Sequence, residues 1–166
     1  WVASLLVMSM LSACGGSLPP PDWQLNARGG LEAYDKHYLA GDTRLAEFNQ
    51  GKARSAIAAS GRLDILARAE LARCAARTAA LAFDDCPAYR ALETDAAPPE
   101  RAYARFLAAD WTGLDTRILP AHYGALIGAR DDAARVEALR GVKDPMARLI
   151  GAALLFKQTA LPPDGI

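Results

Sequence analysis

The sequence has few of the residues that build metal and catalytic centres. It contains three cysteines and two histidines, in neither a CxxC nor an HExxH pattern. It also lacks the G-x-S-x-G nucleophile elbow and the glycine-rich loop that cradles phosphate. We therefore expect no metal, no cofactor and no enzyme activity, with a hydrolase as the less favoured alternative.

An excess of charge of either sign is also missing. Lysine plus arginine and aspartate plus glutamate each number 19, so the formal net charge is zero. A domain that binds nucleic acid usually has a basic excess, so we expect no nucleic-acid partner. No segment alternates polar and apolar residues between turn signals, which argues against β-strands.

The longest uncharged apolar run lies at the beginning, over residues 1–11 (WVASLLVMSML). A membrane span needs about 20 residues, whereas a signal-peptide core is about this length. The run ends in Leu11-Ser12-Ala13-Cys14, which resembles the bacterial lipobox, in which the cysteine becomes lipidated. The alternative, a buried cysteine in an ordinary helix, leaves the following Gly-Gly-Ser and triple proline unexplained.

This resemblance predicts the organisation of the chain. Residues 1–13 are expected to be the later part of a signal peptide that is removed. The sequence starts within this signal, because the initial methionine and basic segment are missing. Residues 14–21 are a lipidated cysteine and a tether that prolines stiffen. Residues 22–166 are one helical domain, and the abrupt ending LPPDGI suggests further helices beyond it. In such lipoproteins, an aspartate directly after the cysteine commonly retains the protein at the inner membrane. Here Gly15 follows the cysteine, so we expect the protein to be anchored on the periplasmic side of the outer membrane.

The rest of the chain is expected to be helical. Apolar spacing and caps predict a first helix through Leu31 that stops at Gly41, and a second from Asp42 to residues 60–61. The strongest prediction is a helix over residues 62–83, which contains no glycine or proline and is apolar or small nearly all round. Shorter helices are predicted over 87–94, 99–109, 115–129 (broken or begun at the proline within it) and 131–140, and a last one starts at 144–145.

The fold class is therefore all-α, built from antiparallel helical hairpins. The segment 38–42 (YLAGD), followed by Ala46 and Ala53, resembles the turn and small positions of a tetratricopeptide hairpin. The resemblance implies a right-handed array, with an irregular bundle as the alternative because no clear period runs through the chain. As a whole, residues 22–156 are similar to α-helical lipoproteins of proteobacteria. That similarity implies a location and a fold but no activity.

Two cysteines remain beyond the lipobox, Cys74 and Cys86. Two thiols in an exported protein are typical of a disulfide. The chain after Leu81 must fold back for the sulfurs to meet, since the predicted helix continues to residue 83. The alternative is two buried free thiols.

On the helix over 62–83, Glu70, Arg73 and Arg77 share one side. They could form a groove for an anionic ligand or partner, or an ordinary ion-paired stripe, which we favour. Glu70 is also the one candidate for a glycan-cleaving acid, although its arginines favour the ionised form.

We expect a membrane-anchored scaffold that binds an envelope protein. It would contact the bilayer through acylated Cys14. The alternative is a hydrolase or carrier acting on cell-wall or lipid fragments.

Overall fold

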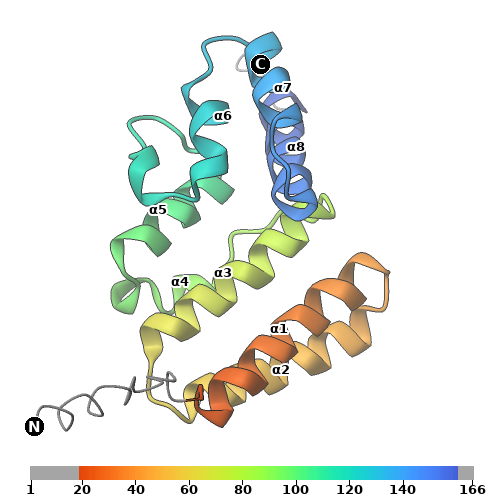
Figure 1. Cartoon of the computed structure of the whole chain (residues 1–166), viewed down its shortest axis with the longest axis vertical. Helices are drawn as coiled ribbons and strands as arrows, with labels where there is room; N and C mark the ends of the chain where they lie inside the picture. Colours follow the sequence, from red (N-terminus) through yellow and green to blue (C-terminus); the bar gives the residue numbers. More distant parts are fainter. Residues whose placement is uncertain (1–18, 161–166) are drawn as a thin grey trace, which may run out of the picture.

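The computed structural model describes residues 19–160, and every regular element within them is a helix (Figure 1). The predicted all-α class is confirmed. The α-helices are α1 Asp22–Leu39, α2 Thr43–Ala58, α3 Leu63–Ala79, α4 Pro87–Arg90, α5 Pro98–Leu107, α6 Gly124–Gly128, α7 Asp132–Arg140 and α8 Pro145–Ala160. Three short 3-10 helices lie between them: η1 Glu93–Asp95, η2 Thr116–Ile118 and η3 Ala121–Tyr123.

Aspartates cap three of these helices, as the sequence predicts. Asp42, Asp131 and Asp144 each accept a hydrogen bond from a backbone N–H in the first turn of α2, α7 and α8. Such a bond satisfies a donor that has no partner within the helix. The distances are 3.1 Å to Leu45 N, 2.8 Å to Ala134 N and 2.7 Å to Ala147 N.

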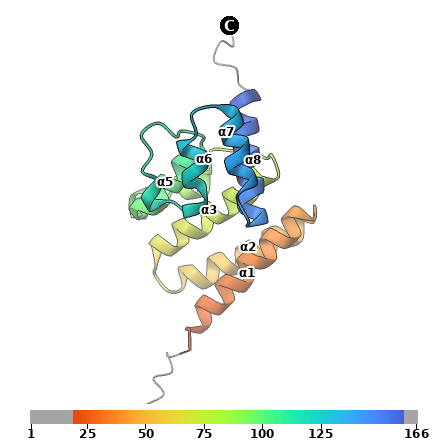
Figure 2. The same ribbon diagram turned by 45° about the horizontal axis from the view of Figure 1, so that its top comes forward.

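Helices α1 and α2 lie side by side along their lengths and are joined by a short turn (Figures 1 and 2). Gly41 in this turn has a φ of +82°, a conformation that favours glycine. Gly30 lets the two helices approach closely, because a Cβ at this position would lie 2.9 Å from both the Ala53 Cβ and the Asn49 carbonyl oxygen. We call these two helices the α1–α2 pair.

Helix α3 lies between the α1–α2 pair and the remainder of the fold (Figures 1 and 2). It packs against α1 and α2 as well as α4, α5 and α8. Its small and apolar side chains are therefore buried on several sides, as predicted for residues 62–83. The main core lies between α3, α5, α6 and α8 and centres on Leu71, Phe106, Tyr123, Leu126 and Leu154.

Several predicted helix boundaries are wrong. No start is predicted for the first helix, and α1 runs from Asp22 to Leu39, next to the predicted stop at Gly41. Helix α3 ends at Ala79, because the chain turns at Leu81, which has a φ of 61°. The segment 115–129 contains two 3-10 turns and the five-residue α6 in place of one helix.

Within residues 19–160, the α1–α2 pair is a hairpin of two long helices joined by a short turn. In the described part of the chain, α4 and α6 are too short to form a second unit of this kind. The array of antiparallel hairpins is therefore not confirmed, and the arrangement after α3 is irregular.

Candidate functional site

Two adjoining cavities, of about 510 and 520 Å³, lie beside α3. Both are lined by Asp35 of α1 and by Arg68 and Ala72 of α3, so they adjoin at these residues, and we call the two cavities together the groove. Each is within the range of about 300–1,000 Å³ that is typical of ligand pockets. The first cavity is lined by Asp35, Arg68, Leu71, Ala72, Ala75, Pro99, Glu100, Tyr103, Ile118, Leu119, Pro120, Met146 and Ile150. The second is lined by Trp23, Gln24, Ala27, Arg28, Leu31, Glu32, Asp35, Ile57, Ile65, Arg68, Ala69 and Ala72.

Helix α3 forms the floor of the groove. Its lining residues run from Ile65 to Ala75, which at a rise of about 1.5 Å per residue is a length of roughly 15 Å. One wall is α1, and the opposite wall comes from α5, η2 and α8. The lining is mainly apolar, and both cavities are open to solvent rather than enclosed.

Asp35 lies where the two cavities meet. Its side chain is half-buried, and within residues 19–160 it makes no hydrogen bond or ion pair. Because burial disfavours the charged form, it raises the pKa of the Asp35 carboxyl to about 6. A carboxylate without a partner thus stands at the centre of the groove.

A second carboxylate faces the first cavity from the first turn of α5. Glu100 is only 5% exposed, and its Oε1 accepts a hydrogen bond from Arg68 Nε at 2.7 Å. The other oxygen, Oε2, is buried and has no hydrogen-bond partner in the described part of the chain. Buried polar atoms are usually paired, so this oxygen has unused capacity to accept a hydrogen bond.

The charges around the groove leave one negative charge uncompensated. Arg68 pairs with Glu100, and Arg28 pairs with Glu32 at 2.8 Å. Asp35 is the remaining carboxylate among the lining residues. A ligand that places a cation beside Asp35 would compensate this charge.

The three residues predicted to form a ligand groove on α3 do not line either cavity. Glu70 is buried and pairs with Arg54 of α2. Arg73 pairs with Glu47 of α2 at 2.8 Å, and Arg77 pairs with Asp84 after α3 at 2.8 Å. All three charges are ion-paired, but their partners lie in neighbouring segments and not along α3 itself, so these ion pairs differ from the expected stripe on one helix.

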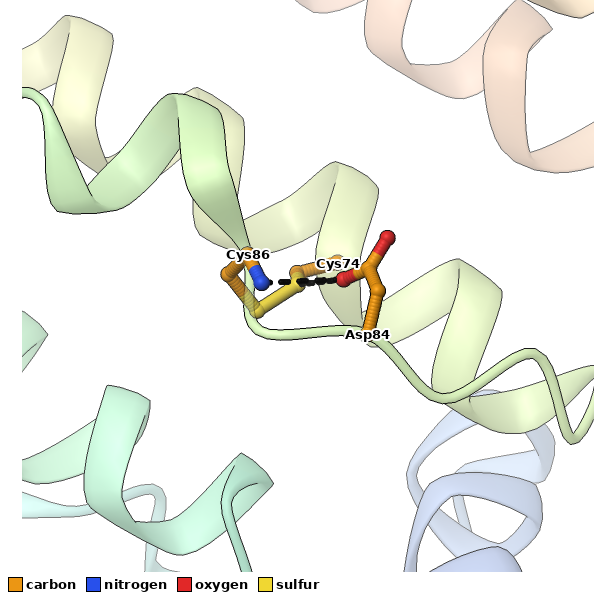
Figure 3. Close-up of side chains that lie close together, drawn as sticks. All are labelled: Cys74, Asp84 and Cys86. Atoms are coloured by element: carbon orange, nitrogen blue, oxygen red, sulfur yellow. Dashed lines mark hydrogen bonds between the residues drawn. A yellow bond between two sulfur atoms is a disulfide. The ribbon is translucent and has the colours of Figure 1, made fainter.

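The predicted disulfide between Cys74 and Cys86 is present, with the two Cα atoms 5.8 Å apart (Figure 3). It is possible because α3 ends early and the chain folds back toward it. Asp84 supports this return: its Oδ1 accepts a hydrogen bond from the Cys86 N–H at 2.9 Å and lies 3.3 Å from the Cys74 sulfur (Figure 3). These three side chains are also the one group of potential metal ligands in residues 19–160, but both thiols are consumed by the disulfide.

The predicted lipid attachment residue, Cys14, lies outside the described residues, as do the predicted signal and most of the tether. Among the described helices, none combines the length and the apolar character that a bilayer crossing requires.

Sequence reasoning missed the residues that define the groove. Asp35 gave a weak signal as an acid among the aromatic residues of its helix, and Glu100 resembled an ordinary acid in a first helical turn. Arg68 and Tyr103 gave none, because their proximity depends on how α3 and α5 pack.

Comparisons with known proteins do not supply a function for these residues. No family model, no curated protein and no solved structure matches the chain. The chemistry of the groove must therefore carry the functional conclusion.

Proposed function

We propose that this chain is a lipid-anchored binding protein of the bacterial envelope, and that the groove over α3 holds a segment of a partner protein. The observation that carries the proposal is the open, mainly apolar groove between α1 and α5. Exposed apolar surfaces of this kind are typical of interaction sites.

The shape of the groove favours a chain segment over an enclosed small molecule. The two cavities adjoin along roughly 15 Å of α3 and are open to solvent. This length suits about ten residues of helix or four to five residues of extended chain. Apolar side chains of the segment would fill the two cavities on either side of Asp35.

The predicted location rests on separate observations. The lipobox-like sequence that ends at Cys14 precedes a Gly/Pro-rich segment, and α1 begins soon after it, at Asp22. A disulfide between Cys74 and Cys86 is typical of an oxidising compartment such as the periplasm. We propose that acylated Cys14 holds the groove close to the membrane, with the outer membrane as the expected site.

Hydrolysis of a glycan is the second candidate function. Asp35, whose pKa is raised to about 6, and Glu100 form a pair of carboxylates in one cavity, as a glycosidase requires. The mainly apolar lining argues against it, because sugar hydroxyls need many hydrogen-bond partners. The lining residues also include no serine, cysteine or histidine in the described part of the chain, which argues against a hydrolase that acts through such a nucleophile.

The proposal can be tested by photo-crosslinking in a proteobacterial host. A photoreactive amino acid would replace Ile118, which is 39% exposed and lines the groove. The matched control replaces Val136 of α7, which is 43% exposed and lines neither cavity. We expect a discrete protein adduct, identified by mass spectrometry, from position 118 and not from position 136.

A groove-filling variant completes the test. Ala72→Trp places a large side chain where the cavities meet and should abolish the adduct, whereas Ala133→Trp on exposed α7 should not. Equal adducts from both positions, or an adduct that persists in Ala72→Trp, would contradict binding in the groove. Cell-wall digestion that depends on Asp35 would favour the hydrolase instead.

The anchor has its own test. A labelled fatty acid should be incorporated into the wild-type protein and not into Cys14→Ser. If neither protein incorporated the label and both were found in the soluble fraction, the lipid anchor would be contradicted. The proposal that the groove binds a partner would be unaffected.

A further inference from the structure

We infer that the partner segment carries one lysine or arginine flanked by apolar residues, and that its cation lies between Asp35 and Glu100. This inference rests on the proposed function and specifies the chemistry of the occupant. It is carried by two carboxylates that line one cavity from different helices, Asp35 from α1 and Glu100 from α5.

Charge complementarity selects a cation. Both ion pairs at the groove, Arg68–Glu100 and Arg28–Glu32, are already formed, which leaves Asp35 as the uncompensated charge. An anionic occupant, such as a fatty-acid carboxylate, would face Asp35 in a partly desolvated setting where like charges repel strongly. A cation would instead be attracted.

Hydrogen bonding points to the same group. Oε2 of Glu100 has no partner in the described part of the chain and less than 1 Å² of accessible surface, so a donor in the cavity reaches it once the carboxylate turns toward the cavity. An ammonium or guanidinium group has several N–H donors, so it can serve Glu100 and Asp35 together. Hydrogen bonds to a carboxylate from a cation are stronger than those from a neutral donor.

A divalent metal ion is a poorer match for the same carboxylates. Calcium requires six to eight oxygen ligands, and Asp35 and Glu100 do not belong to any group of three or more potential ligands within residues 19–160. The surrounding side chains, including Leu71, Tyr103 and Ile150, suit the apolar neighbours of a basic residue.

The test uses pools of synthetic peptides about ten residues long. The flanks are randomised among leucine, isoleucine, phenylalanine, alanine and serine, and the central residue is lysine, glutamine or glutamate. Binding of each pool to the purified chain is measured by fluorescence polarisation. We expect the lysine pool to bind about tenfold or more tightly than the glutamine pool, and the glutamate pool most weakly.

Variants assign this preference to the two carboxylates. Asp35→Asn combined with Glu100→Gln should reduce the preference for lysine to about threefold or less. Glu137→Gln of α7 serves as the control, because that carboxylate is 74% exposed and lines neither cavity. Circular dichroism and thermal unfolding of each variant separate a change of preference from a loss of fold.

The outcomes distinguish this inference from the proposed function. If all pools bound equally and Ala72→Trp abolished that binding, the inference of a cationic occupant would be overturned. The groove would still stand as a binding site. A preference for glutamate would overturn the inference as well. Absence of binding by every pool, or binding that Ala72→Trp leaves unchanged, would overturn both proposals.

Discussion

Asp35→Asn should stabilise the protein at neutral pH. The pKa of Asp35 is about 6 in the folded protein and 3.8 as its ordinary value, so the folded state binds the proton more tightly than the unfolded state. The ionised carboxylate therefore opposes folding. This cost is fully present above about pH 6 and disappears as the pH falls toward 3.8.

The size of the effect follows from the same values. At about 1.4 kcal/mol for each tenfold change in the acid dissociation constant, a pKa raised from 3.8 to about 6 corresponds to at most about 3 kcal/mol. Because Asp35 is only half-buried, solvent screens part of this energy. We expect Asp35→Asn to raise the free energy of unfolding by about 1–2 kcal/mol at about pH 7.5.

The assay is urea unfolding followed by circular dichroism for wild type and variant at about pH 7.5 and about pH 4. The difference between the two proteins isolates Asp35, since the other carboxylates titrate in both. Asp85→Asn is the control, because that side chain is 84% exposed, and it should show no such change with pH. If Asp35→Asn were destabilising at pH 7.5, or equally stabilising at both pH values, the desolvation argument would be refuted.

Two further predictions concern packing and the disulfide. Gly30→Ala should lower the free energy of unfolding by about 1–3 kcal/mol, because the new Cβ would lie 2.9 Å from that of Ala53. Gly29→Ala should instead stabilise the helix by about 0.5–1 kcal/mol, because its new Cβ would have nothing within 4 Å. Urea unfolding measures both, and equal effects would contradict the close approach of α1 and α2. Replacing Cys74 and Cys86 together with alanine should cost about 3 kcal/mol and make the melting temperature insensitive to reductant. A wild-type melting temperature that reductant leaves unchanged would contradict a stabilising disulfide.

Local signals in the sequence were sufficient for the features that depend on neighbouring residues. Asp42 and Asp131 mark helix starts because capping involves residues only three positions apart. The disulfide was also predictable, since Cys74 and Cys86 are the two cysteines that remain beyond the lipobox-like segment and lie 12 residues apart.

The groove could not be predicted in this way. Asp35 and Glu100 line one cavity because α1 and α5 pack against the same central helix, and no periodicity in the sequence encodes that arrangement. Glu70 was a more prominent candidate, because it stands out in an apolar helix. Its charge is used instead to pair with Arg54 of α2.

Close packing also explains why glycine occurs in the middle of a long helix. Gly30 lies within α1, and glycine is required there because α2 leaves no room for a side chain. Tertiary packing therefore outweighed helix propensity at this position.

Methyl NMR of the complex with the lysine-centred peptide pool tests occupancy of the groove most directly. We predict shift changes at the methyl groups of Ala72, Ile118 and Ile150, which line the cavities, and none at Ala133 or Ala134 of α7. Changes confined to α7, with the three groove residues unaffected, would contradict the assignment of the groove as the binding site.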